Sequence, residues 1–275
     1  MNALVGMLRA ASNYHAPVRR AVQKVVDFEV AEVLRMANYH VRSVGTFNDF
    51  IENFYRTSMP VSLEKGAWPV IQSFMIETRK QAALFIESED IEGLVDLNRW
   101  MNGYMTGFIR RYVGSSEAQL KALIEKYPTE VLPRIVKRLG EWKERRAEKV
   151  ASDEIVRSQN GMAMQTWAAQ GVKKFRWVTN PKGHHCPYCS AMNGRTVKVG
   201  DSFFSAGETF YVKFVGGEAV AASVSTQGKK NVEWLWGKEE HKGVESKDWS
   251  GLKMWGDKRH PPIHKGCVCR IVPAK

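Results

Sequence analysis

Apolar residues recur at every third or fourth position through the first part of the chain, which is the spacing of one helix face. Between residues 16 and 42 this stripe consists mainly of valines, and charged residues fill the gaps. Pro17 suits the first turn of such a helix, and Gly45 lies just past its end. The pattern therefore predicts an amphipathic helix over 16–42.

Prolines and a glycine-serine run divide the next stretch. We expect Met59-Pro60 and Trp68-Pro69 to interrupt the helical pattern, because proline removes a backbone hydrogen bond. The run Gly114-Ser115-Ser116 should end a later helix, with Ser116 and Gln119 forming the capping box of a short one. These breaks give helices over 70–85, 91–113 and 118–126.

A long, charged helix is predicted from residue 129 to about 167, with Gly171 as its C-cap. The hydrophobic period then changes from about 3.6 to 2, since Phe175 and Trp177 alternate with less apolar residues. Short strands are predicted over 173–179, 195–199, 209–215, 219–224 and 267–272. The stretch 228–256, with four Trp and many charges, suggests a surface insertion, a partner-binding loop or an irregular lobe.

These elements predict an α+β protein. Its N-terminal part is mainly helical with long helices, and a small mixed α/β lobe with short strands and a Cys/His knot follows. The expected organisation is a helical domain over 1–128, a long connecting helix over 129–170, and a small lobe over 171–275. Within that lobe, residues 200–256 form the insertion.

Composition narrows the class of protein. The 275 residues are 44% hydrophobic and 25% charged, so neither a fibrous repeat nor wholesale disorder is expected. Apolar runs fall short of the roughly 20 residues that span a bilayer, and the first residues lack a secretory signal, so we expect a cytosolic protein without membrane contact. The net charge of +12 favours polyanions, although dispersed basic residues are more often a solvated surface.

All four cysteines fall in two tight clusters. Cys186 and Cys189 are three apart, which allows both thiolates to reach one tetrahedral ion. Two different pairs could supply the remaining ligands of this ion. They are Cys267 with Cys269 on one face of a strand, or His264 with Cys267 as a second zinc knuckle. A closed shell would be structural, with zinc the expected ion. Reduced buried thiols and disulfides are the competing interpretations.

The motifs occur in an order that resembles a known family. The chain carries EIVRSQN at 154–160, GVKKFRW at 171–177, CPYC at 186–189 with Asn193 and Gly194, and HKGCVCR at 264–270 with Val272 and Pro273. This order resembles the C-terminal domain of phage Mu F-type head morphogenesis proteins, the minor head proteins of tailed phages and prophages. The similarity covers about residues 115–275.

The resemblance implies a non-enzymatic protein of procapsid assembly. Such a protein is made in the host cytoplasm and bound at the portal vertex inside the capsid, so it becomes part of the virion. Its partners would be the portal protein, capsid or scaffold components and packaged double-stranded DNA, and it would act in assembly or ejection. The alternatives are a metal-dependent nuclease using His184, His185, His260 or His264, and a zinc-lobed DNA-binding or injected effector protein.

Two further groups on the long helix are candidates for function. Basic residues that could contact DNA phosphates are Lys137, Arg138, Lys143, Arg145, Arg146 and Lys149, although interleaved glutamates also suit a solvated face. Residues expected to brace the helix against the lobe are Glu154, Arg157 and Asn160.

Overall fold

The structure is a computed structural model and describes residues 2–39, 44–86, 97–179, 186–215, 218–225, 231–234, 241–242, 249–254, 256–264 and 266–274. The chain divides into two compact units. The helical unit comprises Met1–Gln81 and Val95–Ile155, and the lobe comprises Ala82–Leu94 and Val156–Lys275. Long helices precede short strands, so the predicted α+β class is confirmed.

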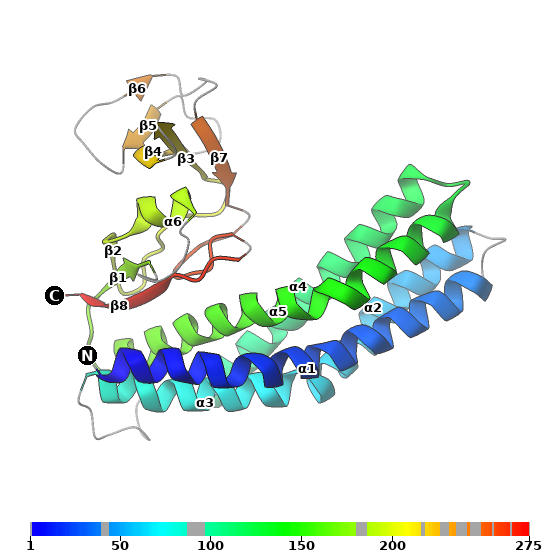
Figure 1. Ribbon diagram of the computed structural model, residues 1–275, viewed down its shortest axis with the longest axis horizontal. Helices are drawn as coiled ribbons and strands as arrows, with labels where there is room; N and C mark the ends of the chain where they lie inside the picture. The colour runs from blue at the N-terminus through cyan, green and yellow to red at the C-terminus, as the bar shows by residue number, and fades with distance from the viewer. Residues whose placement is uncertain are drawn as a thin grey trace. The chain divides into compact units, whose positions relative to one another are not determined.

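Five long helices account for most of the first 170 residues (Figure 1). They are α1 (Asn2–Tyr39), α2 (Val44–Gly66), α3 (Trp68–Phe85), α4 (Leu97–Lys126) and α5 (Val131–Ala169). The predicted valine stripe of α1 is buried, since Val22, Val26 and Val33 have no exposed surface, and α1 packs against α2. The helix predicted over 129–167 agrees with α5 to within two residues at each end.

Two prolines lie inside helices rather than at their ends. Pro17 is within α1 and Pro60 is within α2, so the predicted helix start at 16 and the break at 60 are wrong. The apolar stripe of α1 extends back through Met7 and Ala11, which are buried, and this packing outweighs one lost hydrogen bond. The carbonyl left without an amide partner belongs to the exposed Asn13 in α1, where water can replace it.

The glycine-serine run also lies inside a helix, because α4 continues to Lys126. The predicted end at Gly114 and the capping box at Ser116 are therefore wrong. Ser116 is completely buried and its hydroxyl donates to the carbonyl of Tyr112 one turn earlier, as mid-helix serines do. The first residues of the helix predicted over 91–113 lie outside the described part of the chain.

A three-stranded antiparallel sheet forms the base of the lobe. It contains β1 (Lys174–Val178), β2 (Thr196–Lys198) and β8 (Arg270–Ala274), in the order β2-β1-β8. The first two strands match their predicted ranges to within one or two residues. The last strand begins at Arg270 rather than at 267, so both C-terminal cysteines precede it. Trp177 of β1 lies opposite Ile271 of β8, and both are buried.

The predicted insertion contains a second antiparallel sheet, in the order β6-β5-β4-β3-β7. Its strands are β3 (Thr209–Val215), β4 (Glu218–Ser225), β5 (Asn231–Trp234), β6 (His241–Lys242) and β7 (Trp249–Lys253). Strands predicted over 209–215 and 219–224 are confirmed. A β-bulge between Lys213 and Phe214 shifts the register of the β3–β4 hairpin.

The lobe has its own hydrophobic core between these elements. Trp177, Phe204, Phe210 and Met254 are fully buried there, together with three of the four cysteines. The short helix α6 (Pro187–Met192) closes this core beside the first sheet (Figure 1). None of the described helices has the length and apolar character needed to cross a membrane.

Candidate metal centre

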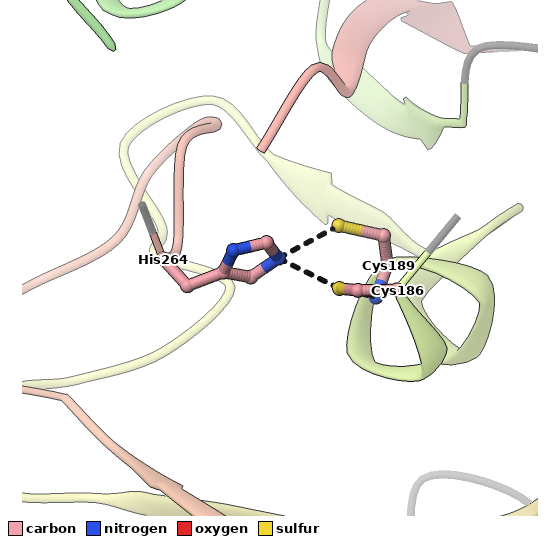
Figure 2. Close-up of side chains that lie close together, drawn as sticks. All are labelled: Cys186, Cys189 and His264. Atoms are coloured by element: carbon pink, nitrogen blue, oxygen red, sulfur yellow. Dashed lines mark hydrogen bonds between the residues drawn. The ribbon is translucent and has the colours of Figure 1, made fainter. Parts of the chain in front are cut away.

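Cys186 and Cys189 are positioned by the start of α6. Cys186 is the N-cap residue, in extended conformation, and its sulfur accepts a hydrogen bond from the backbone amide of Cys189 at 3.4 Å. Pro187 follows in the first turn, where its missing N–H costs nothing. One helical turn therefore places both sulfurs on the same side of α6 (Figure 2).

The second set of donors comes from the chain just before β8. Gly266 has a φ of +73°, a conformation that side-chain-bearing residues rarely adopt, and it turns the chain so that the Cys267 amide donates to the carbonyl of His264. The turn leaves His264 and Cys267 close together. The sequence signal for this knuckle was the spacing of three residues with a glycine between.

The five predicted donors come together in the structure. His264 Nε2 lies 2.7 Å from Cys186 Sγ and 3.1 Å from Cys189 Sγ (Figure 2), and Cys189 Sγ lies 3.6 Å from Cys267 Sγ. The donor atoms form two overlapping groups of three that could each hold a metal ion. These groups are Cys186, Cys189 and His264, and Cys189, Cys267 and Cys269.

Burial differs across this cluster. Cys189, Cys267 and Cys269 are buried, while Cys186 and His264 are half-buried. All four cysteines are free thiols, so the structure holds them as separate donors rather than as disulfides. The expectation that Cys267 and Cys269 share one face of a strand is wrong, because both precede β8; the loop nevertheless brings both sulfurs to Cys189.

Asn160 holds the cysteine loop in place from α5. Its side-chain amide donates to the carbonyl of Cys269 at 3.1 Å and accepts from the amide of Ile271 at 2.9 Å. A β-strand paired with β8 would form the same two hydrogen bonds with these backbone groups. The Asn160 side chain therefore takes the place of a neighbouring strand at the edge of β8. Asn160 is almost completely buried, and its predicted role as a brace fits these contacts.

The sulfurs cannot all ionise together without a cation. Hydrogen bonds from Cys189 and then His264 lower the pKa of Cys186 to about 5, and hydrogen bonds from Cys189 and Cys269 lower the pKa of Cys267 to about 3. The pKa of the neighbouring thiol changes in the opposite direction, because the hydrogen bond with Cys186 raises the pKa of Cys189. Cys186 and Cys267 are therefore thiolates that lie beside two protonated thiols. A divalent cation would allow those two thiols to ionise as well.

Cys269 and the arginine after it are also perturbed. A hydrogen bond with Cys189 lowers the pKa of Cys269, as does the Trp177 indole, but Cys267 and burial outweigh both and raise it. Burial lowers the pKa of Arg270 to about 10, and a thiolate at Cys269 would act in the opposite direction. A cation is therefore kept next to Cys269 inside the lobe, at a desolvation cost.

The predicted DNA-contacting residues divide into exposed and buried ones. Lys137, Lys143, Arg145 and Lys149 are exposed on α5, and Arg138 forms an ion pair with Glu141 at 2.9 Å. Arg146 is different. It is buried, and its guanidinium stacks over the rings of Trp142 and Tyr112 at 4.1 and 4.4 Å from the ring centroids, so it is unavailable to DNA.

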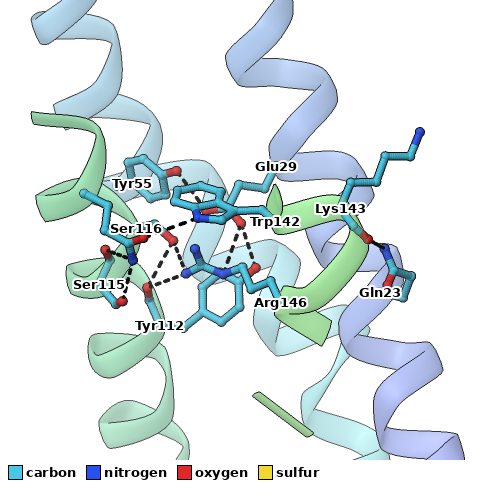
Figure 3. A network of polar contacts seen from close by, with 10 residues as sticks. Gln23, Glu29, Tyr55, Tyr112, Ser115, Ser116, Trp142, Lys143 and Arg146 are labelled. Atoms are coloured by element: carbon cyan, nitrogen blue, oxygen red, sulfur yellow. Dashed lines mark hydrogen bonds and ion pairs between the residues drawn. The ribbon is translucent and has the colours of Figure 1, made fainter. Parts of the chain in front are cut away.

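Arg146 belongs to a buried polar network in the helical unit that the sequence analysis missed (Figure 3). Glu29 of α1 has no exposed surface and accepts hydrogen bonds from Tyr55 at 2.8 Å and Tyr112 at 2.7 Å. Arg146 Nε lies 3.9 Å from the same carboxylate, and its Nη2 donates to Ser116. The sequence did contain an indication of this network, because Glu29 follows Val22 and Val26 on the buried stripe of α1.

The remaining candidates lie elsewhere. Glu154 accepts hydrogen bonds from Tyr104 at 2.6 Å and Arg111 at 3.0 Å, and these contacts join α5 to α4. Arg157, one turn away, is half-buried. His260 donates from Nδ1 to the carbonyl of Pro261. His184 and His185 lie outside the described residues.

Comparisons with protein-family models, curated proteins and solved structures find no match for this chain. The geometry of the centre is therefore the main evidence on function. It shows a group of cysteines and a histidine that could hold a metal ion.

Proposed function

We propose that this chain is a minor head protein of a tailed phage, acting in procapsid assembly at the portal vertex, with a C-terminal lobe held together by structural zinc. The observation that carries the metal part is the convergence of five cysteine and histidine donors from segments about 75 residues apart. The head-assembly part rests on the ordered motifs described above.

The donor set favours zinc. Thiolates and imidazole are soft or borderline ligands, and zinc in structural sites takes four of them in a tetrahedron. With zinc–sulfur bonds of about 2.3 Å, two thiolates of one shell lie roughly 3.8 Å apart. The 3.6 Å between Cys189 and Cys267 is close to that value. The His264 contacts with Cys186 and Cys189 are shorter, so a zinc ion held by these three residues together would require them to move apart by several tenths of an ångström.

The proposed role is structural because the donors would fill the shell. Catalytic zinc sites keep one position for water or substrate, whereas four or more cysteine and histidine donors leave none. The two donor groups contain only cysteine and histidine. The metal would link α6 to the segment before β8, so that the lobe keeps one shape for docking.

Docking at the portal is the proposed use of that shape. The net charge of +12 suits a protein enclosed with packaged DNA, and the exposed Lys143, Arg145 and Lys149 could contact phosphates. In this proposal the lobe binds the portal, and the helical unit supplies the charged surface that faces DNA.

Co-purification with the portal subunit of the same phage tests the proposal. The full chain should retain the portal subunit, and Cys186→Ser or Cys267→Ser should lose both the zinc and the portal. Ser190→Ala is the matched control, since Ser190 is exposed on the same short helix. Portal retention by a cysteine variant that has lost its zinc would contradict the link between metal and docking.

The nuclease alternative is separated by a second assay. The purified chain is incubated with plasmid DNA and Mg²⁺ or Mn²⁺, and the proposal expects the plasmid to remain intact. Cleavage that disappears in His264→Ala would replace the structural interpretation with an enzymatic one.

A further inference from the structure

The indole N–H of Trp177 is a buried donor without a well-aligned acceptor, and the sulfur of Cys269 is the acceptor that it approaches. The side chain is completely buried in the lobe core beside Cys269, and its Nε1 atom makes no hydrogen bond of ordinary geometry with any described residue. Buried indole N–H groups are nearly always bonded, and leaving one unpaired costs about 1–3 kcal/mol. In the same lobe, Trp167 follows this rule and donates to the carbonyl of Ala82 at 2.8 Å.

Arg270, the residue after the same cysteine, is half-buried as a whole but has two buried donor atoms. It follows Cys269 directly, and its Nε and Nη1 atoms are buried without a hydrogen-bond partner among the residues that the structure describes. A buried guanidinium is normally paired with an anion, because removing it from water is expensive. Trp177 and Arg270 belong to different strands, so the two observations are independent.

A negative charge on Cys269 would give the indole an acceptor and would attract the guanidinium. A neutral thiol is a weak hydrogen-bond acceptor, whereas a thiolate accepts well and attracts a cation. A thiolate inside this core needs a metal ion to be stable. The surroundings of Cys269 are therefore those of a metal-bound thiolate rather than of a spare thiol.

We infer that Cys269 is a thiolate ligand of the metal centre, with Trp177 and Arg270 as its supporting partners. Cys186, Cys189 and Cys267 complete an all-sulfur set. His264 then lies outside the shell, as a hydrogen-bond partner of Cys186 and Cys189. This inference rests on the proposed zinc centre and names which of the two possible ligand sets it uses.

Spectroscopy of the full chain loaded with Co²⁺ or ¹¹³Cd²⁺ tests the assignment, because both report the number of bound thiolates. Wild type and His264→Ala should give the same four-thiolate signature. Cys269→Ser should lose about a quarter of the sulfur-to-cobalt charge-transfer intensity. Trp177→Phe should keep four thiolates but bind the metal roughly 10- to 100-fold more weakly, as expected for the loss of a partner that supports a ligand.

Trp167→Phe is the matched control, since it removes a buried indole N–H that is bonded to a backbone carbonyl instead. It should leave the spectrum and the metal affinity unchanged. The inference is overturned if His264→Ala loses a nitrogen ligand, if Cys269→Ser keeps the full signature, or if the two tryptophan variants bind metal equally. In these cases the zinc centre itself would stand, whereas failure of the wild type to bind any metal would remove both.

Discussion

Replacing Arg146 by methionine should destabilise the helical unit by about 3 kcal/mol. The change removes the cation but keeps most of the hydrophobic stem that lies between Trp142 and Tyr112. Glu29 then remains buried with two tyrosine hydroxyls and no positive charge. Removing one member of a buried ion pair costs about 3–5 kcal/mol. The lower end applies here because the nitrogen–oxygen distance is 3.9 Å and the tyrosines already satisfy the carboxylate.

The measurement is urea unfolding followed by circular dichroism at a helical wavelength. Arg138→Met is the matched control, because it breaks an exposed ion pair with Glu141 on the same helix and should cost at most about 1 kcal/mol. The double variant Glu29→Gln with Arg146→Met should cost about 1–2 kcal/mol less than the sum of the single changes. If Arg146→Met is no more destabilising than Arg138→Met, the buried pair does not support the bundle as argued.

Three further outcomes are expected. Burial and then the charge of Glu29 raise the pKa of Tyr55 and Tyr112 well above 10, so both stay protonated in the folded chain. The unfolded chain releases these protons above about pH 10, so stability should fall as pH rises beyond that point. The share of the tyrosinate absorbance that belongs to these two residues should appear together with unfolding. Asn160→Ala leaves the Cys269 carbonyl and the Ile271 amide unpaired and should cost about 2–4 kcal/mol, with weaker metal binding by chelator competition; unchanged metal affinity would show that Asn160 does not position the centre. Exchanging Lys143 and Lys149 for glutamine should reduce the salt-dependent retention of the chain on DNA, and equal elution salt for wild type and variant would argue against phosphate contacts on α5.

Much of the fold could be predicted because its signals are local. Helical periodicity over 129–167 predicted α5, and the change to alternation at Phe175 and Trp177 predicted β1. The spacings of Cys186 with Cys189 and of His264 with Cys267 predicted the donor cluster. Each of these patterns depends on residues within one or two turns of each other, so no knowledge of distant neighbours was needed.

The wrong predictions of helix boundaries and of an exposed Arg146 arose where packing against residues distant in the sequence outweighs a local preference. Pro17 and Ser116 have the preferences of helix ends, yet both lie inside helices. Burial of a continuous apolar stripe outweighs the preference of Pro17 in α1, and the hydrogen bond from Arg146 of α5 outweighs that of Ser116 in α4. Arg146 looked like one of several surface cations. Its partner Glu29 is more than 100 positions away in the chain, and only the bundle brings them together.

The sequence alone determined the order of helices and strands and the set of candidate metal donors, because helix periodicity and ligand spacing are properties of short segments. Tertiary structure decided which charges are buried, and it placed Asn160, Trp177 and Arg270 around Cys269. The physical reason is that the cost of a buried charge or an unpaired donor depends on neighbours contributed by other elements, which no local pattern specifies.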